Sequence, residues 1–157
     1  MLMANTYTQL HVQIVFAVQG RENLVKERFR DELEKVICGI ISENQCKPLA
    51  IYCNPDHTHV LVGIHPTISV AKLAEVIKSS SSGWINRQRL IAGKFHWQGG
   101  YGAFTYSKSQ LDDVVKYILR QPDHHKKQTF REEYLSVLNK LDIQYDDQYL
   151  FEWYDAF

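Results

Sequence analysis

The sequence predicts an α+β fold, in which an antiparallel sheet carries helices on one face in the ferredoxin-like, split βαβ (RRM-like) arrangement. The hydrophobic period alternates between two and about 3.6 in the order strand, helix, strand, strand, helix, strand. Residues typical of turns separate these segments. A chain of 157 residues with 45% hydrophobic and 23% charged residues can bury a core without disulfides. We therefore expect a single domain over residues 1–157 with extra helices at its C-terminal end.

The first half of the chain predicts a strand, a helix and a hairpin. Apolar and polar residues alternate over 10–16, which is typical of a strand, and apolar residues recur at helical spacing over 24–41. Two short apolar segments, 49–53 and 59–64, flank the turn-forming sequence Asn54-Pro55-Asp56. These two segments are expected to pair as a β-hairpin.

The second half predicts three more helices and the last strand. One helix is expected from Ser69, which can cap it, to about residue 89. The aromatic segment 94–106, with glycines at its centre, is expected to complete the sheet, either as two strands around a glycine turn or as one broken strand. A helix capped by Ser109 should end before Pro122, and another should cover 130–141.

The charges are unevenly distributed, although the chain has 18 basic and 18 acidic residues in total. Residues 72–131 contain 11 basic and 4 acidic residues, so this part of the chain carries a strong positive surplus. Such a surplus indicates either a phosphate-binding surface or a solvated helix face. The candidate DNA-binding residues are Arg87, Arg89, Lys116, Arg120, His124, His125, Lys126, Lys127 and Arg131.

Several classes of protein are disfavoured by the sequence. It has neither an apolar run of bilayer length nor the pattern of a signal peptide, so we expect a cytoplasmic protein without membrane contact. The three cysteines show no CxxC spacing and are expected to be reduced. A GxxxxGK[ST] loop is also absent, which argues against a nucleotide cofactor.

His57-Thr58-His59 enters the predicted third strand. Because alternate residues of a strand point to the same face, the two imidazoles are expected to lie side by side. Imidazole nitrogens are common ligands of divalent metals. A metal site is therefore one interpretation, and two strand histidines without a ligand role are the other.

Tyr117 and Gln121 are spaced four residues apart in the predicted helix before Pro122. Side chains at this spacing lie on one helix face, so a phenol and an amide would converge. The alternative is a tyrosine packed against the core and a glutamine at a frayed helix end. Lys116 and Arg120 flank the pair and would attract an anion to Tyr117.

Together, these motifs resemble the single-tyrosine HUH transposases of small bacterial insertion sequences, including the repeat-associated tyrosine transposases. The resemblance covers almost the whole chain. It rests on the opening strand 7–16, the serine-rich helix that ends at 84–86, and the blocks 54–60, 95–104, 117–121, 124–125 and 129–134. The family motif has a hydrophobic residue between its two histidines. Thr58 takes that place here, which leaves both histidines intact.

The resemblance implies a DNA transposase that cleaves and rejoins single-stranded DNA through a 5′-phosphotyrosine intermediate. It implies that Tyr117 is the nucleophile and that His57, His59 and Gln121 hold Mg²⁺ or Mn²⁺. The expected partners are single-stranded or hairpin DNA and a second copy of the chain. In such a homodimer, the helix that carries Tyr117 can complete the site of the other subunit.

Two other functions are compatible with parts of this pattern. One is a non-catalytic, domesticated nucleic-acid-binding module of the same fold, and the other is a metal-binding protein without a nucleic-acid partner. A binding module has no need of Tyr117 and Gln121 at these spacings beside two histidines. A simple metal-binding protein has no need of the positive segment.

Overall fold

A four-stranded antiparallel sheet with the strand order β2-β3-β1-β4 organises the fold. The computed structural model describes residues 6–19, 23–124, 128–146 and 150. Its strands are β1 (His11–Ala17), β2 (Lys47–Cys53), β3 (His57–Gly63) and β4 (Gly102–Thr105). Helix α1 (Glu27–Glu43) joins β1 to β2, and α2 (Val70–Arg87) follows β3. This is the predicted split βαβ order.

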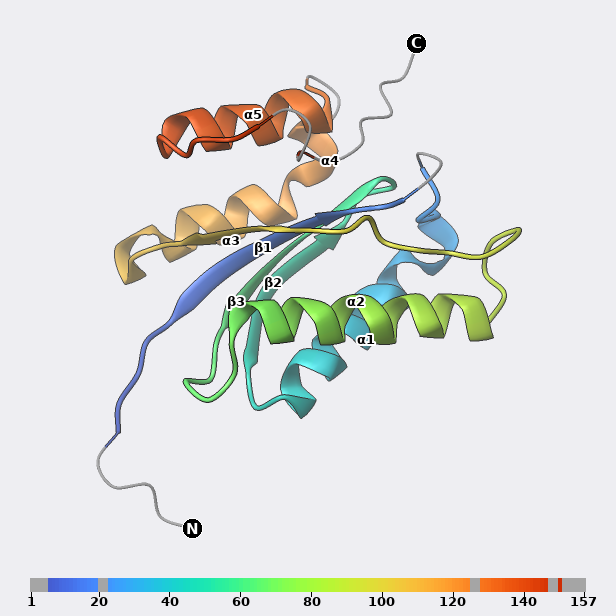
Figure 1. The fold of residues 1–157 in the computed structure, drawn as a ribbon, viewed down its shortest axis with the longest axis horizontal. Helices are drawn as coiled ribbons and strands as arrows, with labels where there is room; N and C mark the ends of the chain where they lie inside the picture. Colours follow the sequence, from blue (N-terminus) through green and yellow to red (C-terminus); the bar gives the residue numbers. More distant parts are fainter. Residues whose placement is uncertain (1–5, 20–22, 125–127, 147–149, 151–157) are drawn as a thin grey trace.

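The C-terminal helices cover the second face of the sheet. They are α3 (Leu111–Leu119), the short α4 (Gln121–His124) and α5 (Phe130–Lys140). Figure 1 shows α1 and α2 on one side of the sheet and α3 and α5 on the other. The sequence predicted helices on one face with extra helices beyond it. In the structure, those extra helices cover the sheet face that carries the histidines.

Alternation along the central strands divides the residues between two cores. Val12, Ile14 and Phe16 of β1 pack with α1 and α2 in the larger core. Val15 and Ala17 face the other way and pack against α5. In the same way, Leu61 of β3 packs against α3. Both faces of the sheet are therefore buried, and the smaller core lies beside the site described below.

The segment 94–106, expected as two strands around a glycine turn or as one broken strand, is mostly irregular and contains one short strand, β4. Only β4 pairs continuously with β1, and Trp97 adds one isolated bridge to Val18. The Asn86 side chain accepts a hydrogen bond from the Phe95 backbone at 2.7 Å and donates one back to it at 3.0 Å. These side-chain bonds replace the strand ladder over this part of the segment.

Helix boundaries agree with the prediction at one cap and differ at the other. The Ser69 side chain caps α2 by accepting a hydrogen bond from the Lys72 backbone, as predicted. Ser109, the other predicted cap, lies inside the 3₁₀ turn η1 (Lys108–Gln110) that precedes α3. Ser107 caps this turn instead, through a capping box with Gln110. The helical segment therefore begins two residues earlier than expected.

Two further expectations concern the cysteines and membranes. Cys38, Cys46 and Cys53 form no disulfide, and the last two are buried. In the described part of the chain, every helix is too short or too polar to cross a bilayer.

Candidate active site

His57 and His59 lie side by side on β3, in the middle of the sheet. Their rings are 5.1 Å apart between centroids, and only 0% and 3% of the two residues is exposed. Both face the layer formed by α3 and α5. Thr58 points into the opposite core, where its strand partners Phe16 and Cys53 lie, and it is fully buried. A small β-branched residue therefore fills the hydrophobic position of the motif.

The outer nitrogen of each imidazole has its own hydrogen-bond partner. His57 Nδ1 donates to Asp56 Oδ1 at 2.6 Å, and the amide of Gln13 donates to His59 Nδ1 at 2.8 Å. Burial lowers the pKa of His57, but the carboxylates of Asp56 and Glu133 outweigh it, so the net pKa is raised. These partners fix both rings with their Nε2 atoms facing the interior of the site.

The tight turn between β2 and β3 holds His57 in place. The backbone N–H of Val18 donates to the carbonyl of Asp56 at 2.9 Å, and that of Val25 donates to the carbonyl of Pro55 at 3.0 Å. The turn is thus tied to the end of β1 and to the segment before α1. Asn54, which precedes the turn, is buried and donates to His57 Nε2 at 3.2 Å.

Glu133 of α5 is the residue at which the site converges. Its Oε1 atom lies 3.0 Å from His59 Nε2 and 3.5 Å from His57 Nε2. Its Oε2 atom accepts hydrogen bonds from the Tyr117 hydroxyl and, at 3.2 Å, from the Gln121 amide. Glu133 is buried, with an exposed fraction of only 3%. One carboxylate therefore contacts all four residues that the sequence singled out.

Tyr117 projects from α3 toward the histidines and is half-buried. Its ring centroid lies 6.0 Å from that of His59, in an edge-on arrangement. Burial raises the pKa of the Tyr117 hydroxyl, and the charge of Glu133 raises it further. In this arrangement the hydroxyl is a neutral donor to a carboxylate.

Gln121 is brought to the same point, although not by a continuous helix. The sequence predicted that Tyr117 and Gln121 share one helix, but α3 ends at Leu119 and Gln121 begins α4. Arg120 lies between the two helices as the C-cap of α3. Gln121 is fully buried, and its Oε1 atom accepts a hydrogen bond from Asn54 at 3.1 Å. The predicted convergence is present despite the break.

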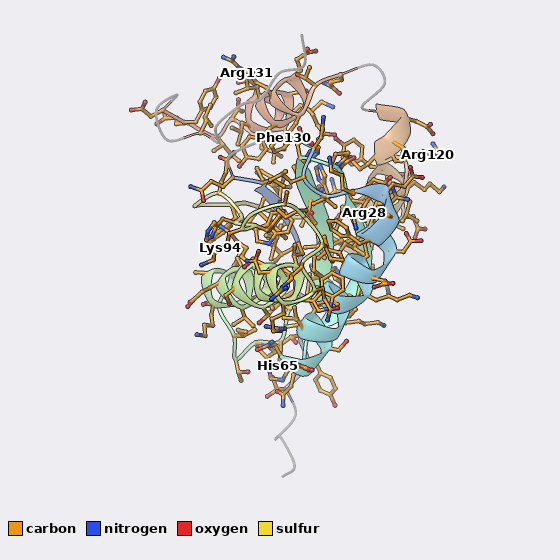
Figure 2. All side chains as sticks on the ribbon, turned by 90° about the vertical axis from the view of Figure 1, so that its right-hand side faces the viewer. Arg28, His65, Lys94, Arg120, Phe130 and Arg131 are labelled. Carbon is orange, nitrogen blue, oxygen red and sulfur yellow. The ribbon has the colours of Figure 1, made fainter. Side chains whose placement is uncertain are left out.

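Phe130, at the start of α5, closes the site above His57. The two rings are stacked with centroids 3.8 Å apart and planes inclined by 11°. Figure 2 shows Phe130 between α5 and the sheet. This contact fixes the end of α5 that carries Glu133.

The polar atoms of this cluster form a set of ligands that suits a divalent cation. One atom each from His57, His59 and Glu133 lies within 4.8 Å of the others, and all three residues are buried. Gln121 adjoins them through its amide nitrogen, which donates to Glu133 Oε2 at 3.2 Å, while its amide oxygen accepts from Asn54. Imidazole nitrogens with carboxylate and amide oxygens fit Mn²⁺, and the oxygen ligands also fit Mg²⁺.

The candidate DNA-binding residues that the structure describes are exposed: Arg87, Arg89, Lys116, Arg120 and Arg131. Arg120 and Arg131 lie on the side of the sheet that α3 and α5 cover, as Figure 2 shows. Arg87 and Arg89 lie at the end of α2, in the opposite layer. The structure therefore divides this set between two layers. The side chain of His124, and residues His125, Lys126 and Lys127, lie outside the described part of the structure.

Sequence reasoning missed Glu133, together with the partners Asp56, Asn54 and Gln13. A signal for Glu133 was present, because it adjoins Tyr134 on the apolar side of the last predicted helix, one turn after Phe130. A carboxylate on the buried side of an amphipathic helix requires a polar partner. The sequence alone did not show that this helix packs over the histidines.

The chain is similar to known transposases in sequence and in fold. The family model described as "Transposase IS200 like" matches residues 6–121. The ISDra2 transposase TnpA of Deinococcus radiodurans is 22% identical over 121 residues, which cover 73% of this chain and 86% of that protein.

Two solved structures share the fold. One, described as a candidate transposase from D. radiodurans, has a TM-score of 0.61 at 20% identity and covers 77% of this chain and 97% of its own. The other is a REP-associated tyrosine transposase bound to a REP hairpin, with a TM-score of 0.58 at 14% identity. That match covers 80% of this chain and 74% of the relative. The family match spans well over half of the chain, and its matched region holds the histidine pair and Tyr117, so the protein belongs to the IS200-like transposases.

Proposed function

We propose that this transposase cleaves and rejoins single-stranded DNA through a covalent 5′-phosphotyrosine link to Tyr117. The observation that carries the proposal is the convergence of Tyr117, Gln121 and both histidines on Glu133 within one chain. A hydroxyl nucleophile beside buried imidazole and carboxylate groups is the arrangement that this chemistry needs. A module that only binds DNA has no requirement for it.

The residues of the chain have separable tasks in the proposed reaction. The Tyr117 oxygen attacks the phosphorus, a new O–P bond forms, and the bond to the 3′-oxygen breaks. The attacking hydroxyl must lose its proton, and Glu133 Oε2 is the acceptor that it already contacts. The released 3′-oxygen takes up a proton. A later attack by another 3′-hydroxyl reverses these steps and joins two strands without ATP.

His57, His59, Gln121 and Glu133 are the residues that would hold the divalent metal in this proposal. Bound there, Mg²⁺ or Mn²⁺ would polarise the scissile phosphate and stabilise the developing charge on the 3′-oxygen. Two imidazoles beside one carboxylate favour Mn²⁺ over Mg²⁺, because Mg²⁺ prefers oxygen ligands. The hydrogen bond from His57 Nδ1 to Asp56 would keep the Nε2 atom of His57 directed at the cation, and the contact with Gln13 would hold the ring of His59 in place.

The proposed substrate is single-stranded DNA next to a hairpin. A structural relative was solved with a REP hairpin bound, which supports this class of partner. The exposed Lys116 and Arg131 belong to α3 and α5, and the exposed Arg120 is the C-cap of α3, so these cations are the proposed contacts to phosphates next to Tyr117.

The described residues favour a site built within one chain. The Tyr117 hydroxyl and the histidines meet the same carboxylate, so the nucleophile is in reach without a second subunit. Homodimer formation stays a prediction. Analytical ultracentrifugation with and without hairpin DNA would test it.

The proposal is tested by covalent capture on denaturing gels. The protein is incubated with Mn²⁺ and single-stranded DNA from the region that flanks its gene, and the adduct is digested and mapped by mass spectrometry. We expect phosphotyrosine at Tyr117 and no adduct from Tyr117→Phe. Tyr101→Phe is the matched control, because Tyr101 is 38% exposed and lies beside Lys78 and Ser82 of α2.

Two outcomes would contradict the proposal. An adduct that persists in Tyr117→Phe would assign the nucleophile to another tyrosine. If the protein binds the DNA tightly but forms no adduct with either metal, the non-catalytic binding module becomes the better interpretation.

A further inference from the structure

A cavity of about 410 Å³ opens between α3 and α5 and ends at the proposed nucleophile. Its inner wall contains His59, Tyr117 and Glu133, and the sheet forms its floor through Val15 and Gln13. Exposed residues at its rim include Gln110 of η1 and Ser136 of α5. A molecule that enters between the two helices would therefore reach the Tyr117 hydroxyl from the side of the sheet.

The lining has the character of a site for a flat, polar-edged ring. Three aromatic residues, Phe104, Tyr106 and Tyr134, supply surfaces on which a ring can pack. Gln110 and Gln128 add uncharged amide groups, which can pair with the donors and acceptors on a base edge. The volume lies within the usual range for small-ligand sites, roughly 300–1,000 Å³, so an unpaired base fits with room for water.

The position of the cavity selects one occupant. Tyr117 and His59 belong both to its wall and to the proposed cleavage site, so a DNA strand that presents a phosphate to Tyr117 must place a neighbouring nucleoside at the cavity. The base of that nucleoside is unpaired in single-stranded DNA and can turn inward without breaking a base pair.

We propose that this cavity binds the nucleobase next to the scissile phosphate, and that it contributes to the choice of cleavage position. The inference rests on the proposed cleavage activity but adds a base-binding site that the activity alone does not require. It predicts a sequence preference at one position next to the cut.

The first experiment measures this preference with two matched variants. A randomised single-stranded DNA library is cleaved with Mn²⁺ present, and both the tyrosine-linked and the released strands are sequenced. Ser136→Trp places a large ring at the exposed rim of the cavity. Asn139→Trp places the same ring on an exposed position of the same helix that does not line the cavity.

We expect wild type and Asn139→Trp to favour one base at a flanking position. Ser136→Trp should reduce that preference about tenfold, which corresponds to the loss of one stacked base. Circular dichroism melts confirm that both variants are folded. A wild-type protein without a flanking preference, or a Ser136→Trp variant with an unchanged one, would overturn the inference while leaving the cleavage mechanism standing.

A second experiment does not depend on cleavage. The Tyr117→Phe protein is irradiated with oligonucleotides that contain 4-thiothymidine, and the crosslinked peptides are mapped by mass spectrometry. We expect crosslinks to Phe104, Tyr106 or Tyr134, reduced about tenfold by adding Ser136→Trp. If wild type forms no adduct but these crosslinks appear, the cavity binds a base although the proposed chemistry fails. Crosslinks confined to other segments would reject the base site.

Discussion

The Tyr117 hydroxyl donates a hydrogen bond to the Glu133 carboxylate, although the two residues belong to different helices and lie 16 positions apart. The contact couples the proposed nucleophile to the residue that also touches both histidines. Glu133 lies beyond the region that the family model matches, which ends at residue 121. Part of the candidate site is thus supplied by the C-terminal segment of this chain.

The role of this carboxylate can be measured with Glu133→Gln. The variant keeps the size of the side chain but removes the charge, the proton acceptor for Tyr117 and one carboxylate ligand of the proposed metal site. We expect the rate of adduct formation to fall about 100-fold, a typical contribution of a proton-transfer group. Glu132→Gln, exposed on the same helix, should behave as wild type. Full activity in Glu133→Gln would restrict the carboxylate to a structural role.

Asp56→Asn tests how His57 is held. Asparagine cannot match the charged hydrogen bond to Nδ1, so Mn²⁺ affinity measured by titration calorimetry should fall about tenfold or more. Asp31→Asn, on the exposed face of α1, is the control. An unchanged affinity would show that Asp56 does not orient the ring.

The same variant should change how stability depends on pH. The folded-state pKa of His57 is raised, so its contribution to stability is complete below the ordinary histidine value and is lost as the pH rises through the raised value. Asp56 contributes to that shift. Without metal, the difference in unfolding free energy between wild type and Asp56→Asn should therefore be larger at about pH 5.5–6 than above about pH 8. These two pH values lie on either side of the ordinary histidine pKa. An equal difference at both pH values, from urea titrations, would contradict this.

Gly102→Ala tests the packing of β4 against α5. A methyl group at this position would lie 2.9 Å from the Cε1 atom of Tyr134, which is closer than real contacts allow. We expect the free energy of unfolding to fall by about 1–3 kcal/mol, as for other overpacked sites. Gly99→Ala is the control, since its methyl group would meet no atom within 4 Å. Equal melting temperatures for the two variants would show that Tyr134 moves aside freely.

The salt dependence of DNA binding tests the cations of the α3 and α5 layer. The plot of log affinity against log salt concentration becomes steeper by about 0.7 for each phosphate that the protein neutralises on a single strand. Removing two contacts in Arg120→Ala/Arg131→Ala should therefore make this slope shallower by roughly 1.4. Lys35→Ala/Lys47→Ala removes two exposed cations from α1 and β2 as a control. If both pairs change the slope equally, binding depends on total charge and not on this layer.

The strand and helix order followed from the sequence because hydrophobic period and turn residues act locally. His57 and His59 share a face for the same reason, since alternation along a strand leaves no other arrangement. The convergence of Tyr117 and Gln121 was also inferred from local spacing. It is present in the structure, although α3 ends before Gln121 and Arg120 separates the two helices. The glycines indicated that the segment 94–106 is interrupted, but the hydrogen bonds between Asn86 and Phe95 were not predictable, because they depend on tertiary contacts.

Glu133, Gln13 and Asn54 are the parts of the candidate site that local patterns could not reveal. Gln13 reaches His59 because β1 and β3 are neighbours, and Glu133 reaches it because α5 crosses the open face of the sheet. Both facts concern which surfaces meet after folding. A buried carboxylate in an apolar helix face indicated that a partner exists, but not which residue it is.

Because α5 follows β3 and α3 in the sequence, the parts of the candidate site are synthesised in a fixed order. The strand with the histidines and the helix with Tyr117 leave the ribosome before Phe130 and Glu133 do. A nascent or truncated chain that ends near residue 121 thus lacks both the carboxylate at the centre of the cluster and the ring stacked on His57. An element that encodes such a protein would expose the genome to the complete candidate site only after α5 has been synthesised.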